Sequence, residues 1–307
     1  MTNTHINYHP GKLTRFLRKL AWFFTVYLPP ERNVTIPTRN GILTFNSKDK
    51  TTGRNLYIRR EHEFDEMTGY VSLLRKEGFL SKSKGKVVLD VGGYIGMSST
   101  AFLLENLFEK AIAFEPSPGN YHLLEKNIIN NHLEDRLIAH NIALSDCDAR
   151  LDFELSEKNY GDHRIRVEGN TQPDAFNEAG RQVISIKACR FDDLDDRQLG
   201  ASKDNIELIW MDIQGHEARF IKGASEFIRK HPAVPVIMEF WPYAIKRSGV
   251  SKQEFIDIVS ALFSGYFVSV GGKFIYYAMS SIGAFFDEQD APGKGSTIVL
   301  CNKTKTQ

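Results

Sequence analysis

The sequence has few cysteines and no excess charge of either sign. Its 307 residues include three cysteines, Cys147, Cys189 and Cys301, which lie far apart with no paired spacing. This argues against a disulfide framework or a zinc cluster and favours a reducing cytoplasm. The 39 Lys and Arg residues balance 38 Asp and Glu, giving a formal net charge of +1. Without a basic excess, the composition gives no reason to expect a nucleic-acid partner.

Long apolar runs, internal repeats and low-complexity tracts are also missing. The apolar run at residues 20–28 stops at Pro29 and Pro30, short of the roughly 20 residues that cross a bilayer, and no small-residue cleavage site follows it. Arg15, Arg18 and Lys19 precede the run. Residues 13–28 therefore predict a short basic, aromatic helix. Docking on its own domain is the simpler interpretation, and peripheral contact with a membrane or a partner is the alternative.

The order of apolar and polar segments predicts an appendage followed by one larger domain. Residues 1–84 predict a helix, a proline-bounded extended piece and a second helix at 63–76, and the polar stretch SKSKGK at 81–86 is the expected boundary. From 85 to 303, short β-branched runs alternate with helical segments, which is typical of a parallel sheet with helices on both faces. An insert at 145–205 interrupts this alternation, and we expect it to be a functional loop or disordered.

Seven runs are expected to form the sheet: KVVLDV, AIAFE, RLIAHNIAL, IELIWMDI, VPVIMEF, YFVSVG and STIVLC. The last two are expected to pair as an antiparallel hairpin at one edge. Seven strands that end in this way indicate an α/β, Rossmann-like fold of the class I methyltransferase type rather than of the dehydrogenase type.

A glycine-rich turn follows the first of these runs, in VVLDVGGYIGMSST at 87–100. Gly92, Gly93 and Gly96 lie between a strand and a helix, where the absence of Cβ atoms lets the backbone approach a ligand. The start of the helix offers free N–H groups and a partial positive charge. Glu115 ends the next strand about 20 residues further on, where a carboxylate can bind ribose hydroxyls. Together these features predict a nucleotide-like cofactor.

The turn differs from a dinucleotide-binding loop in two respects. Its glycines do not follow the G-x-G-x-x-G spacing, and Asp90 stands directly before them, where its charge would repel a pyrophosphate. An acid at this position suits a ligand with an ammonium group. S-adenosylmethionine carries an ammonium, a sulfonium and a ribose, so it is the cofactor that the turn favours. The alternatives are a nicotinamide-dependent oxidoreductase and a non-catalytic module that keeps the fold for partner or membrane-surface binding.

Several segments resemble the FkbM-type methyltransferases, a family of S-adenosylmethionine-dependent enzymes. The resemblance rests on LDVGGYIGMSS, AFEPSPGNYHLLEKNIINN, NIALSD, FDDLD and IWMDIQGHEARFIKGA followed by VIMEFWP, in the family's order. The stretch D-x-Q-G-x-E usually reads D-x-E-G-x-E in the family, so Gln214 is a departure that removes a charge. The first 80 residues carry none of these motifs.

The resemblance implies methyl transfer, commonly to a hydroxyl of a sugar or a secondary metabolite, and therefore a small-molecule acceptor in the cytoplasm. The positions that it assigns to the cofactor are Asp90, Gly92, Gly96 and Glu115. It places Asn141 and Ala143 beside the adenine, and Asp212 next to the methyl donor.

A hydroxyl acceptor gains from a base that takes its proton during attack. The candidates are Asp212, His216 and Glu239 near strand ends, and His163 in the insert. Each has a structural alternative: Asp212 caps a helix, His216 merely begins that helix, Glu239 forms an ion pair, and His163 lies in an ordinary solvated loop. Asp212 and Glu239 also suit Mg²⁺, but no metal-binding motif accompanies them, and we expect metal independence.

Overall fold

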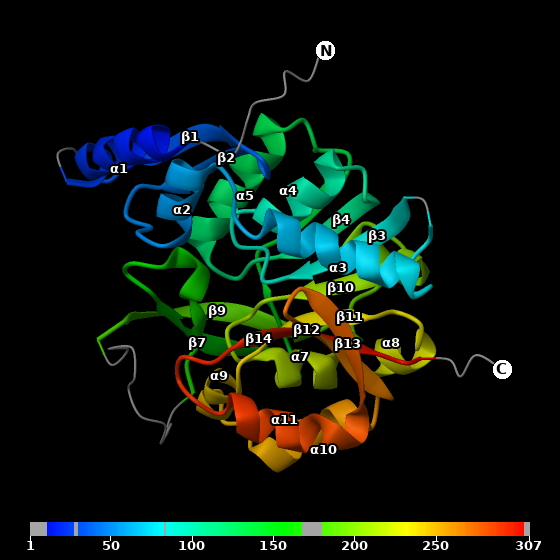
Figure 1. The fold of residues 1–307 in the computed structure, drawn as a ribbon. Coiled ribbons are helices and arrows are strands. Elements are labelled where there is room, and N and C mark those ends of the chain that lie inside the picture. The colour runs from blue at the N-terminus through cyan, green and yellow to red at the C-terminus, as the bar shows by residue number, and fades with distance from the viewer. Residues whose placement is uncertain (1–10, 28–29, 83, 168–179, 304–307) are drawn as a thin grey trace.

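Apolar strands from residue 85 onward assemble into one central sheet of eight strands (Figure 1). The computed structural model describes residues 11–27, 30–82, 84–167 and 180–303, so Leu28 of the expected helix and residues 168–179 of the expected insert lie outside the described residues. Across the sheet, the strands run in the order β13 (Lys273–Ala278), β12 (Gly265–Val270), β14 (Ser296–Cys301), β11 (Val236–Phe240), β10 (Ile206–Met211), β3 (Gly85–Val91), β4 (Phe108–Phe114) and β5 (Leu137–His140).

The sheet is parallel from β11 to β5 and antiparallel at the other end. The Rossmann-like α/β class is confirmed, but the expected number of seven strands is wrong by one. The runs YFVSVG and STIVLC do pair, yet β14 lies between β11 and β12, and the edge hairpin is instead β12 with β13. The strand β13, with the sequence KFIYYA, was missed although its residues are mostly apolar or aromatic; in the structure most of them are exposed at the edge of the sheet.

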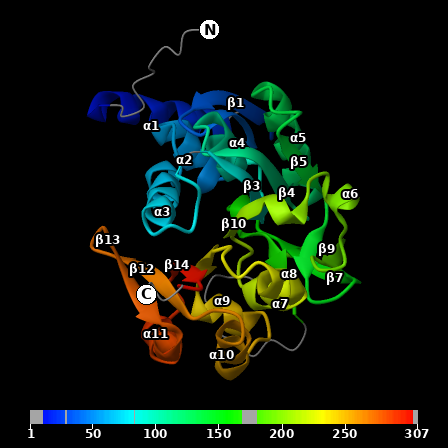
Figure 2. The same ribbon diagram turned by 90° about the vertical axis from the view of Figure 1, so that its right-hand side faces the viewer.

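Alternation along the strands sends side chains to two separate cores. Helices lie on both sides of the sheet (Figure 2). In β3, Val87, Leu89 and Val91 pack into one core and Val88 into the other, so Asp90 shares the face of Val88. The helices on the face of Val88 are α3 (Phe64–Lys76), α4 (Met97–Leu104) and α5 (Pro118–Asn130). Those that contribute to the opposite core are α6 (Asp196–Leu199), α7 (Glu217–Gly223), α8 (Ser225–Lys230), α9 (Pro242–Arg247), α10 (Lys252–Ser260) and α11 (Ile282–Gln289).

The expected insert forms most of a second, smaller sheet. Its strands run in the order β6 (Ala143–Ser145), β9 (Gln182–Arg190), β7 (Ala149–Leu155) and β8 (Arg164–Ile165). The run RLIAHNIAL, expected as one strand, splits into β5 and β6, which belong to different sheets. The described residues also include three short 3₁₀ turns: η1 (Tyr160–Asp162), η2 (Lys203–Asn205) and η3 (Met279–Ser281).

The first part of the chain covers the α4–α5 side of the main domain. It comprises α1 (Lys12–Tyr27), the hairpin of β1 (Asn33–Thr38) and β2 (Gly41–Asn46), α2 (Thr52–Arg59) and α3. Asn127 of α5 holds the hairpin, because its side-chain amide accepts a hydrogen bond from Thr44 N (2.6 Å) and donates to Thr44 O (3.1 Å). Helix α3 packs in the same core as Val88. The division of the chain at residue 84 remains a sequence-based prediction.

Candidate active site

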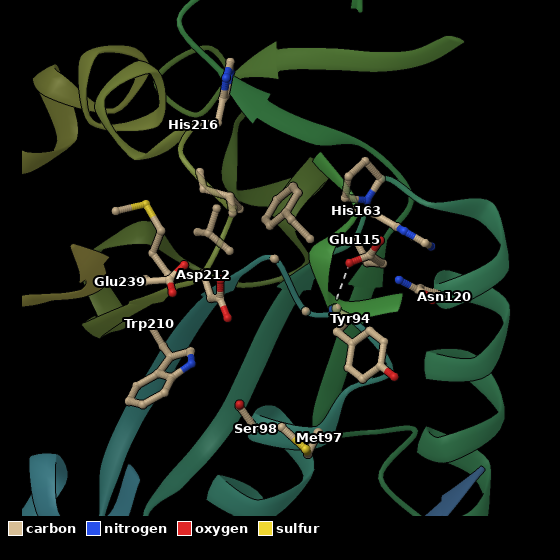
Figure 3. Close-up of a pocket in the computed structure, with 18 of the residues that line it drawn as sticks. Tyr94, Met97, Ser98, Glu115, Asn120, His163, Trp210, Asp212, His216 and Glu239 are labelled. Atoms are coloured by element: carbon tan, nitrogen blue, oxygen red, sulfur yellow. Dashed lines mark hydrogen bonds between the residues drawn. The ribbon is translucent and has the colours of Figure 1, made fainter. Parts of the chain in front are cut away.

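The carboxyl ends of the parallel strands open into a cavity, as expected for an open α/β sheet (Figure 3). Its walls come from the turns after β3, β4, β10 and β11, from the second sheet, and from the start of α3. The structure brings together eight of the residues expected at the site: Gly92, Gly93, Glu115, Ala143, His163, Asp212, His216 and Glu239. Segments that are far apart in the sequence therefore meet at one place.

The glycine turn is shaped as much by a neighbouring strand as by the cavity. Gly92 has a φ of +91°, and a Cβ there would lie 1.9 Å from the carbonyl oxygen of Asp212. Its N–H and that of Gly93 both donate to the Phe114 carbonyl, at 3.0 and 2.9 Å. These two N–H groups hold the turn to β4, and Gly92 is glycine because β3 and β10 approach closely at this point.

Three expected cofactor residues, Asp90, Gly96 and Asn141, do not line the cavity. Asp90 is 1% exposed and accepts a hydrogen bond from the hydroxyl of Ser99 in α4, and burial raises its pKa to about 6. Gly96 is the N-cap of α4, in the left-handed conformation. The Asn141 amide donates to the carbonyl oxygens of Glu115 (2.9 Å) and Pro116 (3.2 Å). These three residues therefore contact parts of the protein next to the cavity rather than the cavity itself, and their contact with a cofactor remains a prediction.

Glu115 lines the cavity directly after β4. Its two carboxylate oxygens accept hydrogen bonds from the backbone N–H groups of Tyr94 and Ser117, both at 2.8 Å. Burial raises the pKa of Glu115 to about 8, against the opposing effect of these hydrogen bonds. Asn120, in the first turn of α5, lines the cavity on the same side and donates to the Tyr160 carbonyl at 2.9 Å. This side of the cavity therefore presents a carboxylate that the backbone holds in place.

The other side of the cavity carries a pair of carboxylates joined by Gln214. The side-chain N–H groups of Gln214 donate to Asp212 (2.6 Å) and to Glu239 (3.0 Å). Gln214 reaches both because it and Gly215 adopt left-handed backbone conformations, with φ of +56° and +107°. The family's usual glutamate would place a third acceptor at this position, whereas the amide of Gln214 supplies donors.

Both carboxylates are easier to protonate than ordinary acids. Desolvation by the cavity walls, and then the negative charge of Glu63, raises the pKa of Asp212 to about 7. Asp212 still faces the cavity and is accessible to solvent, so water there limits this effect. Desolvation, and then the charge of Asp212, raises the pKa of Glu239 well above its ordinary range. The two acids thus form one titrating unit that binds a proton near neutral pH.

Glu63 is a site residue that the sequence analysis missed. It lines the cavity as the N-cap of α3, with a φ of +54°; its side chain is 46% exposed, and partial desolvation followed by the charge of Glu66 raises its pKa. It belongs to the first 84 residues, which carry no family motif, and a glutamate at the start of a helix is common for reasons unrelated to function. An acid held in the left-handed conformation would have been a signal, but backbone conformation is not visible in sequence.

Both histidines expected at the site, His163 and His216, have one ring nitrogen close to a neighbouring polar group. The Nδ1 atom of His163 accepts a hydrogen bond from Ser156 N (2.9 Å), and burial lowers its pKa to about 4. The neutral ring then carries its proton on Nε2, so His163 is a donor rather than a base at that atom.

His216 is buried, and its Nε2 lies 2.9 Å from the hydroxyl of Ser145. Burial lowers its pKa to about 4. Figure 3 shows His216 well apart from Asp212 and Glu239. The carboxylate pair is therefore the stronger candidate for proton transfer.

Two searches of the described ranges gave negative results. No group of three or more His, Cys, Asp and Glu side chains there is arranged to hold a metal ion. No helix in those ranges has the length and apolar character needed to span a membrane.

Comparisons with known proteins agree with this geometry. The family model described as "Methyltransferase FkbM domain" matches residues 90–267. The 2-O-methyltransferase NoeI of Sinorhizobium fredii (strain NBRC 101917 / NGR234) is 30% identical over 150 residues, which cover 47% of this chain and 59% of NoeI. The chain thus spans less than two thirds of that relative's length.

Some solved structures resemble part of this chain. Methyltransferase FkbM from Methylobacillus flagellatus KT gives a TM-score of 0.43 at 16% identity, over 80% of this chain and 52% of that one. A putative tRNA methyltransferase from Streptococcus pneumoniae, in complex with S-adenosyl-L-methionine, gives 0.35 at 13% identity, over 78% of this chain and 74% of that one.

Proposed function

The chain belongs to the FkbM methyltransferase family, and we propose on that basis that it is an S-adenosylmethionine-dependent O-methyltransferase for a neutral, hydroxyl-bearing small molecule. One observation carries this proposal: the glycine turn with Glu115 and the carboxylate pair of Asp212 and Glu239 line the same cavity. The first group suits a cationic nucleoside cofactor, and the second suits a hydroxyl that must lose its proton.

The residues on the Glu115 side fit S-adenosylmethionine. Glu115 would accept hydrogen bonds from the ribose hydroxyls, beside the backbone of Gly93 and Tyr94. Ala143, which the family resemblance assigns to the adenine, also lines the cavity. The cofactor carries positive charge, and the acids that line the cavity favour a cation over a phosphate-rich ligand. When bound, it supplies a methyl group activated by its sulfonium centre.

The residues on the other side fit an acceptor hydroxyl. Asp212, whose pKa is raised to about 7, is matched to a base that works near neutral pH. It would take the hydroxyl proton onto a carboxylate oxygen, while Glu239 and Gln214 orient it. Positioning of the hydroxyl supplies much of the remaining rate enhancement.

The cavity mouth favours an uncharged polar acceptor. Thr52, Asn55 and Asn159 border the opening beside the carboxylate pair, and they offer hydrogen-bonding groups that suit a sugar-like molecule. The acids at the same opening, Glu63, Asp212 and Glu239 among them, outnumber Lys158 and Arg181 there and disfavour an anionic acceptor. The similarity to a protein named a 2-O-methyltransferase supports a hydroxyl acceptor.

Calorimetry and a methyl-transfer screen test this proposal. The purified chain should bind S-adenosylhomocysteine and not NAD, and it should transfer labelled methyl from S-adenosylmethionine to members of a panel of neutral saccharides. Binding of NAD in place of S-adenosylhomocysteine would favour the oxidoreductase. Binding of the nucleoside without turnover on any acceptor would favour the non-catalytic module. Full activity after chelation is expected, and restoration by added Mg²⁺ would contradict metal independence.

A further inference from the structure

Helix α1 turns its apolar face away from the protein. Its apolar residues at 13, 16, 17, 20, 23, 24 and 27 follow the spacing of one helical face. All seven side chains are exposed, from 47% for Leu20 to 71% for Leu13. An amphipathic surface helix normally buries this face against its own domain. The outward face is defined here as Leu13, Phe16, Leu17, Leu20, Phe23, Phe24 and Tyr27.

The opposite side of α1 fixes this orientation. Trp22 is 5% exposed, and its ring centroid lies 5.3 Å from that of Tyr57 and 6.3 Å from that of Phe45. Arg18 donates from its guanidinium to the Ile58 carbonyl of α2 at 3.1 Å. Helix α1 is therefore docked by one side, at the outer edge of the molecule (Figures 1 and 2), and cannot roll its outward face inward without losing these contacts.

Basic residues lie along one edge and at one end of the outward face. Lys12, Arg15 and Lys19 are exposed along one edge of it, and α1 contains no acidic residue. At the far end, the Lys50 ammonium lies 5.6 Å from the centroid of the Tyr27 ring. The whole chain has a net charge of only +1, so this is a local excess.

We infer that α1 docks the protein on an anionic membrane surface, with the outward face in the boundary between headgroups and acyl chains. A helix with aromatic and leucine side chains on one face and Lys and Arg beside them has the character of an interfacial helix. Its 16 residues are about 24 Å long, and they lie along the surface rather than across it. Anionic lipid supplies the negative charge that the helix itself lacks. A symmetric pair of copies would bring two such helices together without an acid between them.

The docked helix would end close to the proposed active site. Tyr27 and Val26 border a hollow whose other wall includes Tyr160 and His163, and both of these also line the cavity. Docking would therefore hold this side of the site near the lipid headgroups.

Co-sedimentation of the full chain with vesicles tests this inference without any need for methyl transfer. We expect binding to vesicles that contain phosphatidylglycerol, weaker binding at high salt, and little binding to phosphatidylcholine alone. Phe16→Glu and Phe23→Glu should each lower the affinity about tenfold or more, because each removes a buried aromatic ring from the bilayer and adds a charge. Replacement of Lys12, Arg15 and Lys19 by Gln should lower it about fivefold for each charge removed.

Ile129→Glu is the matched control, because Ile129 is 61% exposed on α5, outside the outward face. It should bind vesicles like the unchanged chain, and all variants should keep the thermal stability of the unchanged chain. Absence of binding by the unchanged chain, equal loss in Ile129→Glu, or equal binding to phosphatidylcholine would overturn the inference. A dimer in solution that Phe16→Glu dissociates, without vesicle binding, would assign the outward face to a second copy instead.

Discussion

The two sides of the cavity are built in opposite ways. On the Glu115 side, backbone groups hold the turn and the carboxylate: Gly92 and Gly93 donate to Phe114, and Glu115 accepts from two N–H groups. On the Asp212 side, side chains hold side chains, and the three acids that meet there all have raised pKa values. The first arrangement fixes the shape of the glycine turn, whereas the second provides carboxylates that bind a proton near neutral pH. A cofactor that is the same in every turnover suits the first, and an acceptor that must be deprotonated suits the second.

The largest effect on kcat is expected from substitution of Asp212, the proposed base. Asp212→Asn is expected to lower kcat about 10²- to 10⁴-fold, because the amide cannot accept the hydroxyl proton. The affinity for S-adenosylhomocysteine, measured by calorimetry, should stay unchanged. If kcat survives, the proton goes elsewhere and the proposed division between the two sides fails.

Substitution in the glycine turn should lower the stability of the folded protein rather than the rate of methyl transfer. Gly92→Ala is expected to lower the free energy of unfolding by about 2–4 kcal/mol, because its Cβ would collide with the Asp212 carbonyl. Gly78→Ala is the matched control, with a φ of +81° and open space around the new Cβ, and should cost about 1 kcal/mol. Chemical denaturation measures both. Equal losses would mean that the contact with Asp212 is not what requires glycine at 92.

Glu115→Gln should weaken cofactor binding about 10- to 100-fold, because the amide replaces one of the two oxygens that would accept from the ribose and turns an NH₂ group toward a backbone N–H donor. The carboxylate on the opposite side provides the control, since Glu239→Gln should leave the affinity for S-adenosylhomocysteine unaltered. Calorimetry on both variants compares the two sides directly. A larger loss in Glu239→Gln would reverse the assignment of cofactor and acceptor.

The smallest expected effect is a shift in pH dependence. The base works only when deprotonated, so kcat should rise as the pH increases through about 7, the raised pKa of Asp212. Gln214→Glu adds a like charge and should move this rise upward by roughly one pH unit. Gln214→Leu removes the same hydrogen bonds without the charge, so a similar shift in that variant would show that lost hydrogen bonds, and not repulsion, are responsible.

Local pattern located part of the Glu115 side. Gly92 and Gly93 of the turn and Glu115 after the second run lie within 30 residues of each other and line the cavity as expected. Asp90 and Gly96, in contrast, do not line it, and Gly92 proved to serve strand packing as well. The alternation of side chains along the strands also predicts residues on the Asp212 side of the cavity. Trp210 and Ile237 pack in the same core, so Asp212 and Glu239, two residues further along each strand, follow on that face.

Tertiary contacts decided the parts that have no local signature. Glu63 enters the site from a helix far from the family motifs, and only the docking of α3 brings it near Asp212. Asp90 lies outside the cavity lining and accepts a hydrogen bond from Ser99 of α4, a contact between elements that no local pattern indicates, and its contact with a ligand stays a prediction. The edge strand β13 is a different case, because its apolar and aromatic run KFIYYA and the turn at Gly271 and Gly272 before it are visible in the sequence and were overlooked.

The amino-acid sequence by itself determined most of the strand–helix order, the glycine turn after β3 and the amphipathic character of α1, because each depends on the pattern of neighbouring residues. Only the tertiary structure decided which face of α1 is buried, that Gln214 joins Asp212 and Glu239, and that Glu63 lines the same cavity. Those outcomes depend on contacts between residues distant in sequence, and no local period encodes such contacts.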